Sequence, residues 1–162
     1  MERHLGVLPA AGRILDLACG NGRHTRLLAA CGHSVLAVDR DSEALQAVAG
    51  LPEVSPLVAD IEGEVWPLTG LHFAGIVVTN YLWRPRLPDL LATLAPGGVL
   101  IYETFMVGNE AYGKPSRPEF LLQPQELLAV ARDHGLQVLA YEEGFTETPK
   151  PAVRQAICAR RS

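Results

Sequence analysis

Apolar and mixed segments alternate along almost the whole chain. Nearly continuous runs of valine, isoleucine, leucine and alanine recur between stretches that mix apolar with polar residues. Continuous apolar runs are typical of strands buried on both faces of a parallel sheet, and the mixed stretches are typical of the helices that cover it. The pattern predicts strands at 14–18, 35–38, 54–59, 75–79 and 98–102, and helices at 23–31, 42–49, 86–94 and 123–134.

The last part of the chain departs from this alternation. Two strand-like runs, 136–142 and 152–159, follow one another without a helix, and the connection between them contains Pro149 and Pro151. Such runs pair as an antiparallel hairpin, here joined by a stiff loop. The predicted fold is therefore α/β, a doubly wound, seven-stranded and mostly parallel sheet with a C-terminal antiparallel hairpin, in one domain spanning 1–162.

Composition narrows the choice of partners. The chain has 162 residues, of which 48% are hydrophobic, and 18 acidic residues against 14 basic ones give a formal charge of −4. A negative charge is the wrong sign for binding nucleic acid mainly through its phosphates, so bulk nucleic-acid binding is disfavoured, although a local basic patch remains open. No apolar run reaches the roughly 18 residues of a membrane span, and the N-terminus shows no apolar signal segment. We therefore expect a cytoplasmic protein without membrane contact.

The cysteines carry no evident chemistry. Cys19, Cys31 and Cys158 are isolated from one another and form no C-x-x-C pattern with histidines. We therefore expect neither a disulfide framework nor a metal site. Cys19 lies in a glycine-rich loop, where it is interpreted as a small lining residue; a reactive thiolate is the alternative.

A nucleoside site is indicated after the first two predicted strands. The segment from Asp16 to Gly22 follows an apolar run, and Asp39 ends the next run after one helix length. Gly20 and Gly22 let backbone approach a ligand where a Cβ would collide with it. A carboxylate at position 39 suits the two hydroxyls of an unmodified ribose and would repel a 2′-phosphate. The pattern predicts an adenosine ligand with a free ribose.

The landmarks resemble those of a known family. The chain from 13 to 159 is similar to the class I S-adenosylmethionine-dependent methyltransferases through Asp16-Leu-Ala-Cys-Gly-Asn-Gly22, Asp39, Asp60-Ile61, Asn80, Ala95-Pro-Gly-Gly98 and the terminal hairpin. Glu103-Thr-Phe105 and Phe120-Leu-Leu122 most resemble small bacterial enzymes of the tellurite-resistance type. The resemblance implies the Rossmann-like methyltransferase fold, S-adenosylmethionine as cofactor and methyl transfer to a small-molecule acceptor. Members usually carry further helices before the first strand, whereas about a dozen residues precede Arg13 here, which indicates a minimal or shortened enzyme.

The resemblance also implies which residues meet the cofactor. Asp16 and nearby carbonyls would face its cationic methionine end, Asp39 its ribose, and Asp60 with the Ile61 amide its adenine. Asp39 as a helix cap and Asp60 as a turn former are the alternatives. The full predicted cofactor set is Asp16, Ala18, Cys19, Gly20, Asn21, Gly22, Asp39, Arg40, Asp60, Ile61 and Asn80.

Acceptor residues are predicted after the fourth and fifth strands. Methyl transfer is an in-line displacement in which alignment carries most of the catalysis, so a dedicated base is optional. The catalytic candidates are Asn80, Tyr81, Glu103 and Tyr112. Trp83 is a further lining candidate, although packing between helices is its alternative. His24 is interpreted as a surface histidine rather than a base.

Four basic residues near the predicted acceptor site bear on the charge of the acceptor. Arg84, Arg86, Lys114 and Arg117 lie in the same two segments, where they would either attract an anionic acceptor or form a solvated face. Asn80-Tyr-Leu-Trp83 differs from the Asn-Pro-Pro-Tyr type used on the amino groups of bases. That difference argues against a nucleic-acid amine as acceptor.

Two alternatives and one dynamic prediction complete the interpretation. A nicotinamide oxidoreductase is disfavoured because Gly20-x-Gly22-x-x-Thr25 lacks the third glycine of that motif. A catalytically idle cofactor-binding subunit of a larger complex remains open. Residues 106–119, rich in glycine and proline around Tyr112, are predicted to form a mobile lid over the acceptor. The sequence leaves open the acceptor's identity, the atom that is methylated and the oligomeric state.

Overall fold

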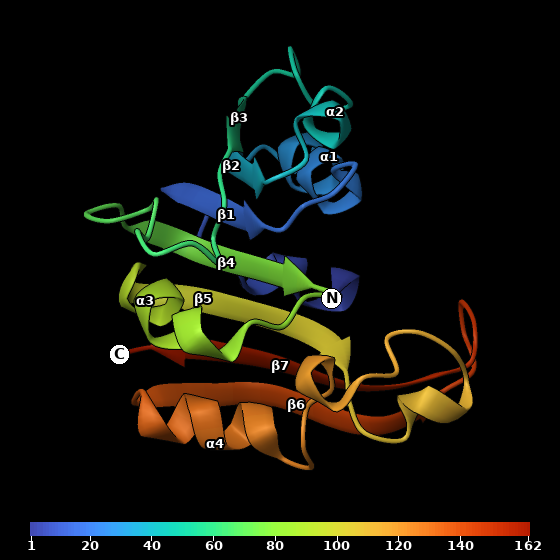
Figure 1. Cartoon of the computed structure of the whole chain (residues 1–162). Helices are drawn as coiled ribbons and strands as arrows, with labels where there is room; N and C mark the ends of the chain where they lie inside the picture. The colour runs from blue at the N-terminus through green and yellow to red at the C-terminus, as the bar shows by residue number, and fades with distance from the viewer.

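The computed structural model describes residues 1–162, and its strands form one seven-stranded sheet in the order β3-β2-β1-β4-β5-β7-β6 (Figure 1). Strands β1 to β5 are parallel, and β7 is antiparallel to both of its neighbours, β5 and β6. The predicted fold class is confirmed, including the C-terminal hairpin. The strands are β1 (Arg13–Leu17), β2 (Ser34–Asp39), β3 (Val54–Val58), β4 (Phe73–Thr79), β5 (Leu94–Phe105), β6 (Leu136–Thr146) and β7 (Ala152–Arg161).

Helices cover both faces of the sheet. Helices α3 and α4 lie on the face turned toward the viewer in Figure 1, where the larger core of 24 buried residues forms. The other face packs on a smaller core that includes Leu8 and Leu28. None of the helices combines the length and the apolar character needed to cross a membrane. The α-helices are α1 (Arg23–Ala30), α2 (Ser42–Leu45), α3 (Leu87–Ala92) and α4 (Glu126–Asp133); the 3-10 turns are η1 (Glu2–Val7), η2 (Arg84–Arg86), η3 (Asn109–Ala111) and η4 (Pro118–Phe120).

Two helices are shorter than predicted. After Leu45 the chain makes tighter i→i+3 bonds, such as Val48 N–H to the Leu45 carbonyl, so α2 ends four residues early. Helix α4 begins at Glu126 rather than at 123, because Gln125 has a positive φ of 60° and Pro124 lacks an N–H. The Glu126 carboxylate instead accepts from the Gln123 N–H and closes this turn.

The boundary between α3 and β5 also moves. Residues 86–94 were predicted as helix, yet Leu94 already pairs with Phe73 as the first residue of β5. The Ala95-Pro-Gly-Gly98 segment then forms an irregularity within the strand, where the register shifts between Phe73 and Gly75. Strand β3 forms as predicted despite Pro56, because β3 is an edge strand with a partner on only one side.

Candidate active site

The carboxyl ends of β1 to β5 meet at one edge of the sheet, because these strands are parallel. Strand β7 runs the opposite way, and Arg154 near its start lies opposite Phe105 at the end of β5. Two groups of residues therefore share this edge. We call them the β1–β3 loops (residues 18–22, 39–41 and 59–62) and the β4–β7 cavity (the space beside residues 80, 103 and 154).

Gly20 and Gly22, the two glycines of the first loop, differ in the space around them. Gly22 has a φ of 74°, and a Cβ added to it would lie 2.1 Å from Cγ1 of Val48. Gly20 has a φ of 54°, and no heavy atom lies within 4 Å of the position of its missing Cβ. Gly22 is thus required by packing, whereas Gly20 leaves backbone open to the space where a ligand would lie.

Asp39 ties the first two loops together. Its Oδ2 accepts from the Gly20 N–H at 2.8 Å, and its Oδ1 accepts from the Asp41 N–H at 2.9 Å. The helix-capping role considered for Asp39 belongs to Asp41, which accepts from Glu43 and Ala44 at the start of α2. Each oxygen of Asp39 keeps further lone-pair capacity for a ligand hydroxyl.

Asp16 is enclosed by protein. Its side chain is 1% exposed, and its Oδ2 accepts from Oγ1 of Thr25 at 2.6 Å. Burial raises the pKa of Asp16 to about 6, although the bond from Thr25 opposes the rise. Burial likewise raises the pKa of the neighbouring Cys19 thiol to about 12, so the thiol stays protonated at neutral pH, which argues against a reactive thiolate.

The third loop contacts the residues after β4 through Glu62, which was not predicted as a site residue. Asp60 Oδ1 accepts from the Glu62 N–H at 2.9 Å, which is the turn-forming bond considered for it. The Glu62 carboxylate then accepts from the Tyr81 hydroxyl at 2.9 Å. Burial and this bond raise the pKa of Tyr81, so its phenol is a donor and not a base. Ile61 is buried beside them, while Arg40 and Asn21 are exposed.

The β4–β7 cavity has a volume of about 640 Å³ and a mostly polar lining. Asn80 and Glu103 contribute to it, as predicted, and so does Arg154, which was not predicted. Arg154 Nη1 donates to Asn80 Oδ1 at 2.6 Å and lies 3.7 Å from a Glu103 oxygen. Burial raises the pKa of Glu103, but the Met1 α-ammonium at 2.9 Å, together with Arg154, outweighs it and holds that pKa below its ordinary value.

His24 also lines this cavity and is buried, not on the surface as predicted. Its Nε2 lies 3.0 Å from Nη2 of Arg23, and its Nδ1 lies 3.1 Å from Oγ1 of Thr79. A guanidinium can only donate, so Nε2 accepts and Nδ1 carries the proton. Burial lowers the pKa of His24 to about 4, which makes it a neutral donor to Thr79 and a weak base.

Tyr112 does not line the β4–β7 cavity itself but contacts Phe145, which does. Tyr112 is 51% exposed and stacks on Phe145 near the end of β6, with ring centroids 5.1 Å apart. Figure 1 shows its segment extending beyond the end of β5, near the tip of the β6–β7 hairpin. The segment is anchored by the buried Asn109, which donates to the Pro115 carbonyl and accepts from the Val153 N–H.

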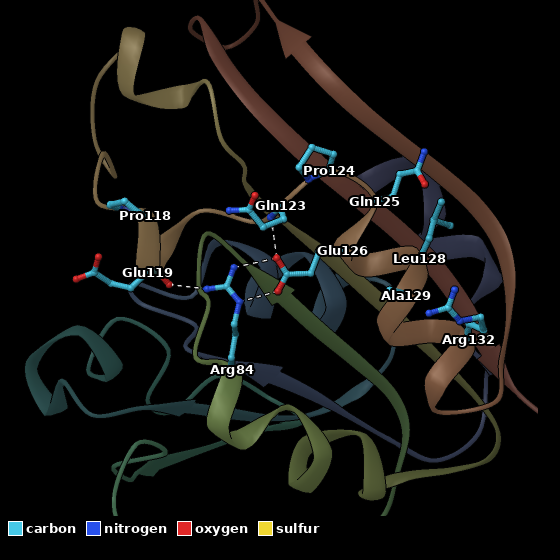
Figure 2. A pocket seen from close by; sticks show the side chains of 10 residues that line it. All are labelled: Arg84, Pro118, Glu119, Gln123, Pro124, Gln125, Glu126, Leu128, Ala129 and Arg132. Atoms are coloured by element: carbon cyan, nitrogen blue, oxygen red, sulfur yellow. Dashed lines mark hydrogen bonds and ion pairs between the residues drawn. The ribbon is translucent and has the colours of Figure 1, made fainter.

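The predicted basic group is largely occupied by internal contacts. Arg84 forks onto the Glu126 carboxylate and donates to the carbonyls of Glu119 and Leu121, beside an open groove of about 910 Å³ (Figure 2). Arg86 pairs with Asp89. This groove is larger than the β4–β7 cavity, but it contains none of the predicted site residues. No cluster of three or more histidine, cysteine, aspartate or glutamate side chains is arranged to hold a metal ion.

Comparison with known proteins identifies the family. Residues 14–98 match the family model described as a methyltransferase domain. The chain belongs to this methyltransferase family. A tRNA U34 carboxymethyltransferase from Methylococcus capsulatus is 34% identical over 126 residues, which cover 70% of this chain and 38% of that protein. The chain thus spans well under half of this curated relative.

Solved structures agree on the fold. TehB from Haemophilus influenzae superposes with a TM-score of 0.80 at 20% identity, over 99% of this chain and 60% of that one. A 1,6-didemethyltoxoflavin-N1-methyltransferase from Burkholderia thailandensis, solved with S-adenosylhomocysteine, gives a TM-score of 0.73 at 17% identity, over 99% and 77%. The predicted methyltransferase family is confirmed, and with it the choice of S-adenosylmethionine as cofactor, while the likeness to TehB is a likeness of fold. These findings do not favour the nicotinamide oxidoreductase.

Proposed function

We propose that this methyltransferase domain binds S-adenosylmethionine on the β1–β3 loops and transfers its methyl group to a small molecule in the β4–β7 cavity. The observation that carries the proposal is the pairing of Gly20 with Asp39: open backbone lies beside a carboxylate that still has lone pairs free. A polar cavity opens beside the next strands of the same edge.

In this proposal the loops divide the cofactor between them. The Asp39 carboxylate accepts from the ribose hydroxyls, and the backbone around Gly20 faces the methionine portion. Asp16, whose pKa of about 6 allows ionisation at neutral pH, supplies the negative charge behind the loop that a sulfonium and an ammonium need. Arg40, Asp60, Ile61 and Tyr81 surround the adenine side.

Methyl transfer depends mainly on the alignment of the acceptor, the methyl group and the sulfur. The acceptor's lone pair attacks the methyl carbon while the carbon–sulfur bond breaks, which leaves neutral S-adenosylhomocysteine and shifts the positive charge to the acceptor. Glu103, ionised in the cavity, takes the proton that a neutral acceptor releases, and Asn80 orients the acceptor beside the sulfonium. Tyr112 and its segment would close the cavity from the outside. The three cysteines are all free thiols, which favours a reducing compartment such as the cytoplasm.

Calorimetry and a transfer assay test the proposal separately. We expect binding of S-adenosylmethionine and S-adenosylhomocysteine but not of NAD, because a binding site for NAD would need a pyrophosphate cradle. The protein is then incubated with methyl-labelled cofactor and either a small-metabolite extract or total tRNA. Label in small molecules supports the proposal. Label in tRNA alone contradicts the small acceptor, and binding without transfer to either supports the idle subunit.

A further inference from the structure

Arg154 differs from the half-buried Arg84 in how many of its donors are used. Arg84 makes four hydrogen bonds within the protein, whereas the guanidinium of Arg154 makes one, to Asn80. Phe105 holds the guanidinium plane, with Cζ of Arg154 4.0 Å from its ring centroid. A guanidinium carries several N–H donors in a fixed fork. Arg154 therefore presents unused donors to the cavity that it lines.

The same contact fixes the orientation of the Asn80 amide. Because a guanidinium only donates, the Asn80 atom at 2.6 Å from Nη1 must be the oxygen. The NH₂ group of Asn80 then has no hydrogen-bond partner within the protein. Asn80 holds a left-handed backbone, with φ at 55°, where β4 ends, so this amide is placed by the strand and by Arg154 together. Between Asn80 and Arg154 the cavity wall therefore presents donors, while the nearby Glu103 carboxylate is paired with the Met1 α-ammonium.

Arg154 is the least exposed of the arginines that line the cavity, while Lys150, which also lines it, is exposed and has no ion pair. Arg3 is paired with Glu142, and Arg23 lies 3.6 Å from Glu2. Glu103 is the nearest carboxylate to Arg154, at 3.7 Å, which is beyond hydrogen-bond distance, and it accepts from the Met1 α-ammonium instead. The Arg154 side chain is only 18% exposed, so its charge is poorly screened by water.

We propose that the acceptor is a small carboxylate-bearing molecule, whose carboxylate is bound by the unused N–H groups of Arg154 and by the NH₂ group of Asn80. The planar fork of a guanidinium matches a carboxylate in geometry as well as in charge. An amine would meet donors facing donors, so this wall selects against it. The inference rests on the proposed function, because it names the acceptor class of that cavity, and it moves the anion-binding role from the predicted Arg84 group to Arg154.

Matched probes test the acceptor class directly. Benzoate, benzamide and benzylamine have the same ring and differ in the charge of the substituent. Their binding to protein saturated with S-adenosylhomocysteine is measured by ligand-observed NMR. We expect benzoate to bind at millimolar concentration and the amide and the amine to bind at least about tenfold more weakly, the scale for losing a charged hydrogen bond. Equal binding of all three, preference for benzylamine, or no binding of benzoate would overturn the proposal.

Variants assign the preference to its residues. Arg154→Gln should abolish benzoate binding, and Arg154→Lys, which keeps the charge but loses the fork, should retain only part of it. Asn80→Asp keeps the acceptor for Arg154 but removes the NH₂ group and adds a negative charge, so it should also lose benzoate. The control is Arg160→Gln, an exposed arginine near the other end of β7, where it pairs with Val99. Unchanged benzoate binding in Arg154→Gln contradicts the assignment.

Two further readouts separate this proposal from a structural role and from the proposed function. Added guanidinium ion should restore benzoate binding to Arg154→Ala, whereas urea, its neutral analogue, should not; lack of rescue in a folded variant contradicts a direct role. Cofactor affinity is measured by calorimetry on the same samples. Absence of S-adenosylmethionine binding in the unmodified protein would contradict the proposed function. Normal cofactor binding without a preference for benzoate would contradict only this inference.

Discussion

The two halves of the sheet edge are held together in different ways. In the β1–β3 loops, carboxylates accept from backbone N–H groups: Asp60 from Glu62 and Asp39 from Asp41, each two residues away, and Asp39 also from Gly20, 19 residues away. In the β4–β7 cavity, side chain meets side chain across 74 residues, as in the contact between Arg154 and Asn80. The first half is a framework of backbone, and the second is an arrangement of side chains.

This difference has a consequence for how the two halves respond to change. Backbone donors are present whatever the residue, so the loops depend on a few positions with special geometry. The cavity depends on the identity of each side chain that reaches into it. A substitution in the loops should therefore affect the common cofactor and the stability, whereas one in the cavity should change which acceptor is bound.

Gly22→Ala should have the largest effect. The added Cβ would lie 2.1 Å from Val48 Cγ1 and would require a non-glycine residue at a φ of 74°. We expect a loss of about 2–5 kcal/mol in the free energy of unfolding, from overpacking and backbone strain together. Denaturant unfolding measures it. The control is Gly32→Ala, at a φ of 89° with open space around it, which should lose only the strain, about 1–2 kcal/mol. Equal losses would show that the contact with Val48 is unimportant.

Asp16→Asn should change how stability depends on pH. The folded-state pKa of about 6 lies above the unfolded value of 3.8, so the folded protein binds this proton more tightly. The stabilisation is complete below pH 3.8 and is lost as pH rises through about 6. The variant should flatten this part of the profile and be more stable at pH 7 by on the order of 3 kcal/mol without cofactor.

A second variant checks the cause of the Asp16 effect. Thr25→Val removes the hydroxyl that opposes the rise, so the midpoint of the pH profile should move upward. Urea unfolding across the pH range measures both variants. A profile for Asp16→Asn that matches the unmodified protein would exclude Asp16 as the titrating group.

Asp39→Ala should weaken binding of S-adenosylmethionine by about 1.5–3 kcal/mol, the scale for hydrogen bonds to a charged group. The loss includes the ribose contacts proposed here and the bond that holds Gly20 in place. Asp41→Ala is the matched control, because it removes the cap of α2 and should lower stability by about 1 kcal/mol without changing affinity. Calorimetry measures the cofactor affinity of both variants. Similar affinities in Asp39→Ala and Asp41→Ala would show that Asp39 does not bind the cofactor.

Tyr112→Ala should have the smallest effect on stability, because both it and Phe145 are exposed. The lid prediction concerns mobility. Hydrogen exchange in residues 110–117 should slow when cofactor and a carboxylate probe are both bound, while the buried Asn109 stays protected throughout. Equally fast exchange with and without ligands would contradict the lid. Slow exchange in both states would indicate a permanently packed loop.

The β1–β3 loops could be predicted from sequence because their interactions are local. The order of strand, glycine loop, helix and Asp39 predicts both this part of the fold and the position of the proposed cofactor site. The positions of the strands follow from their burial on both faces. Chain geometry finer than this pattern could not be predicted, such as the tight turns that end α2 after Leu45 or the positive φ of Gln125 that delays α4.

The β4–β7 cavity could be predicted only in part, because its residues are brought together by strand order. Asn80 and Glu103 were predicted from their places at strand ends. Arg154 lies in an alternating strand whose local pattern resembles that of any half-exposed strand, and only the pairing of β7 with β5 brings it to the edge. Tyr112 was predicted from its place after β5, and its contact with Phe145, which lines the cavity, could not be predicted because it depends on the β6–β7 hairpin.

The place of β7 between β5 and β6 sets an order of assembly during synthesis. The residues of the β1–β3 loops leave the ribosome before β7, and most of their hydrogen-bond partners are close to them in the sequence. Strand β5 keeps an open edge until β7 emerges, although β6 has already been made. Arg154 reaches Asn80 only at that point. A nascent chain stopped before β7 would carry the loops but would lack Arg154 in the wall of the cavity.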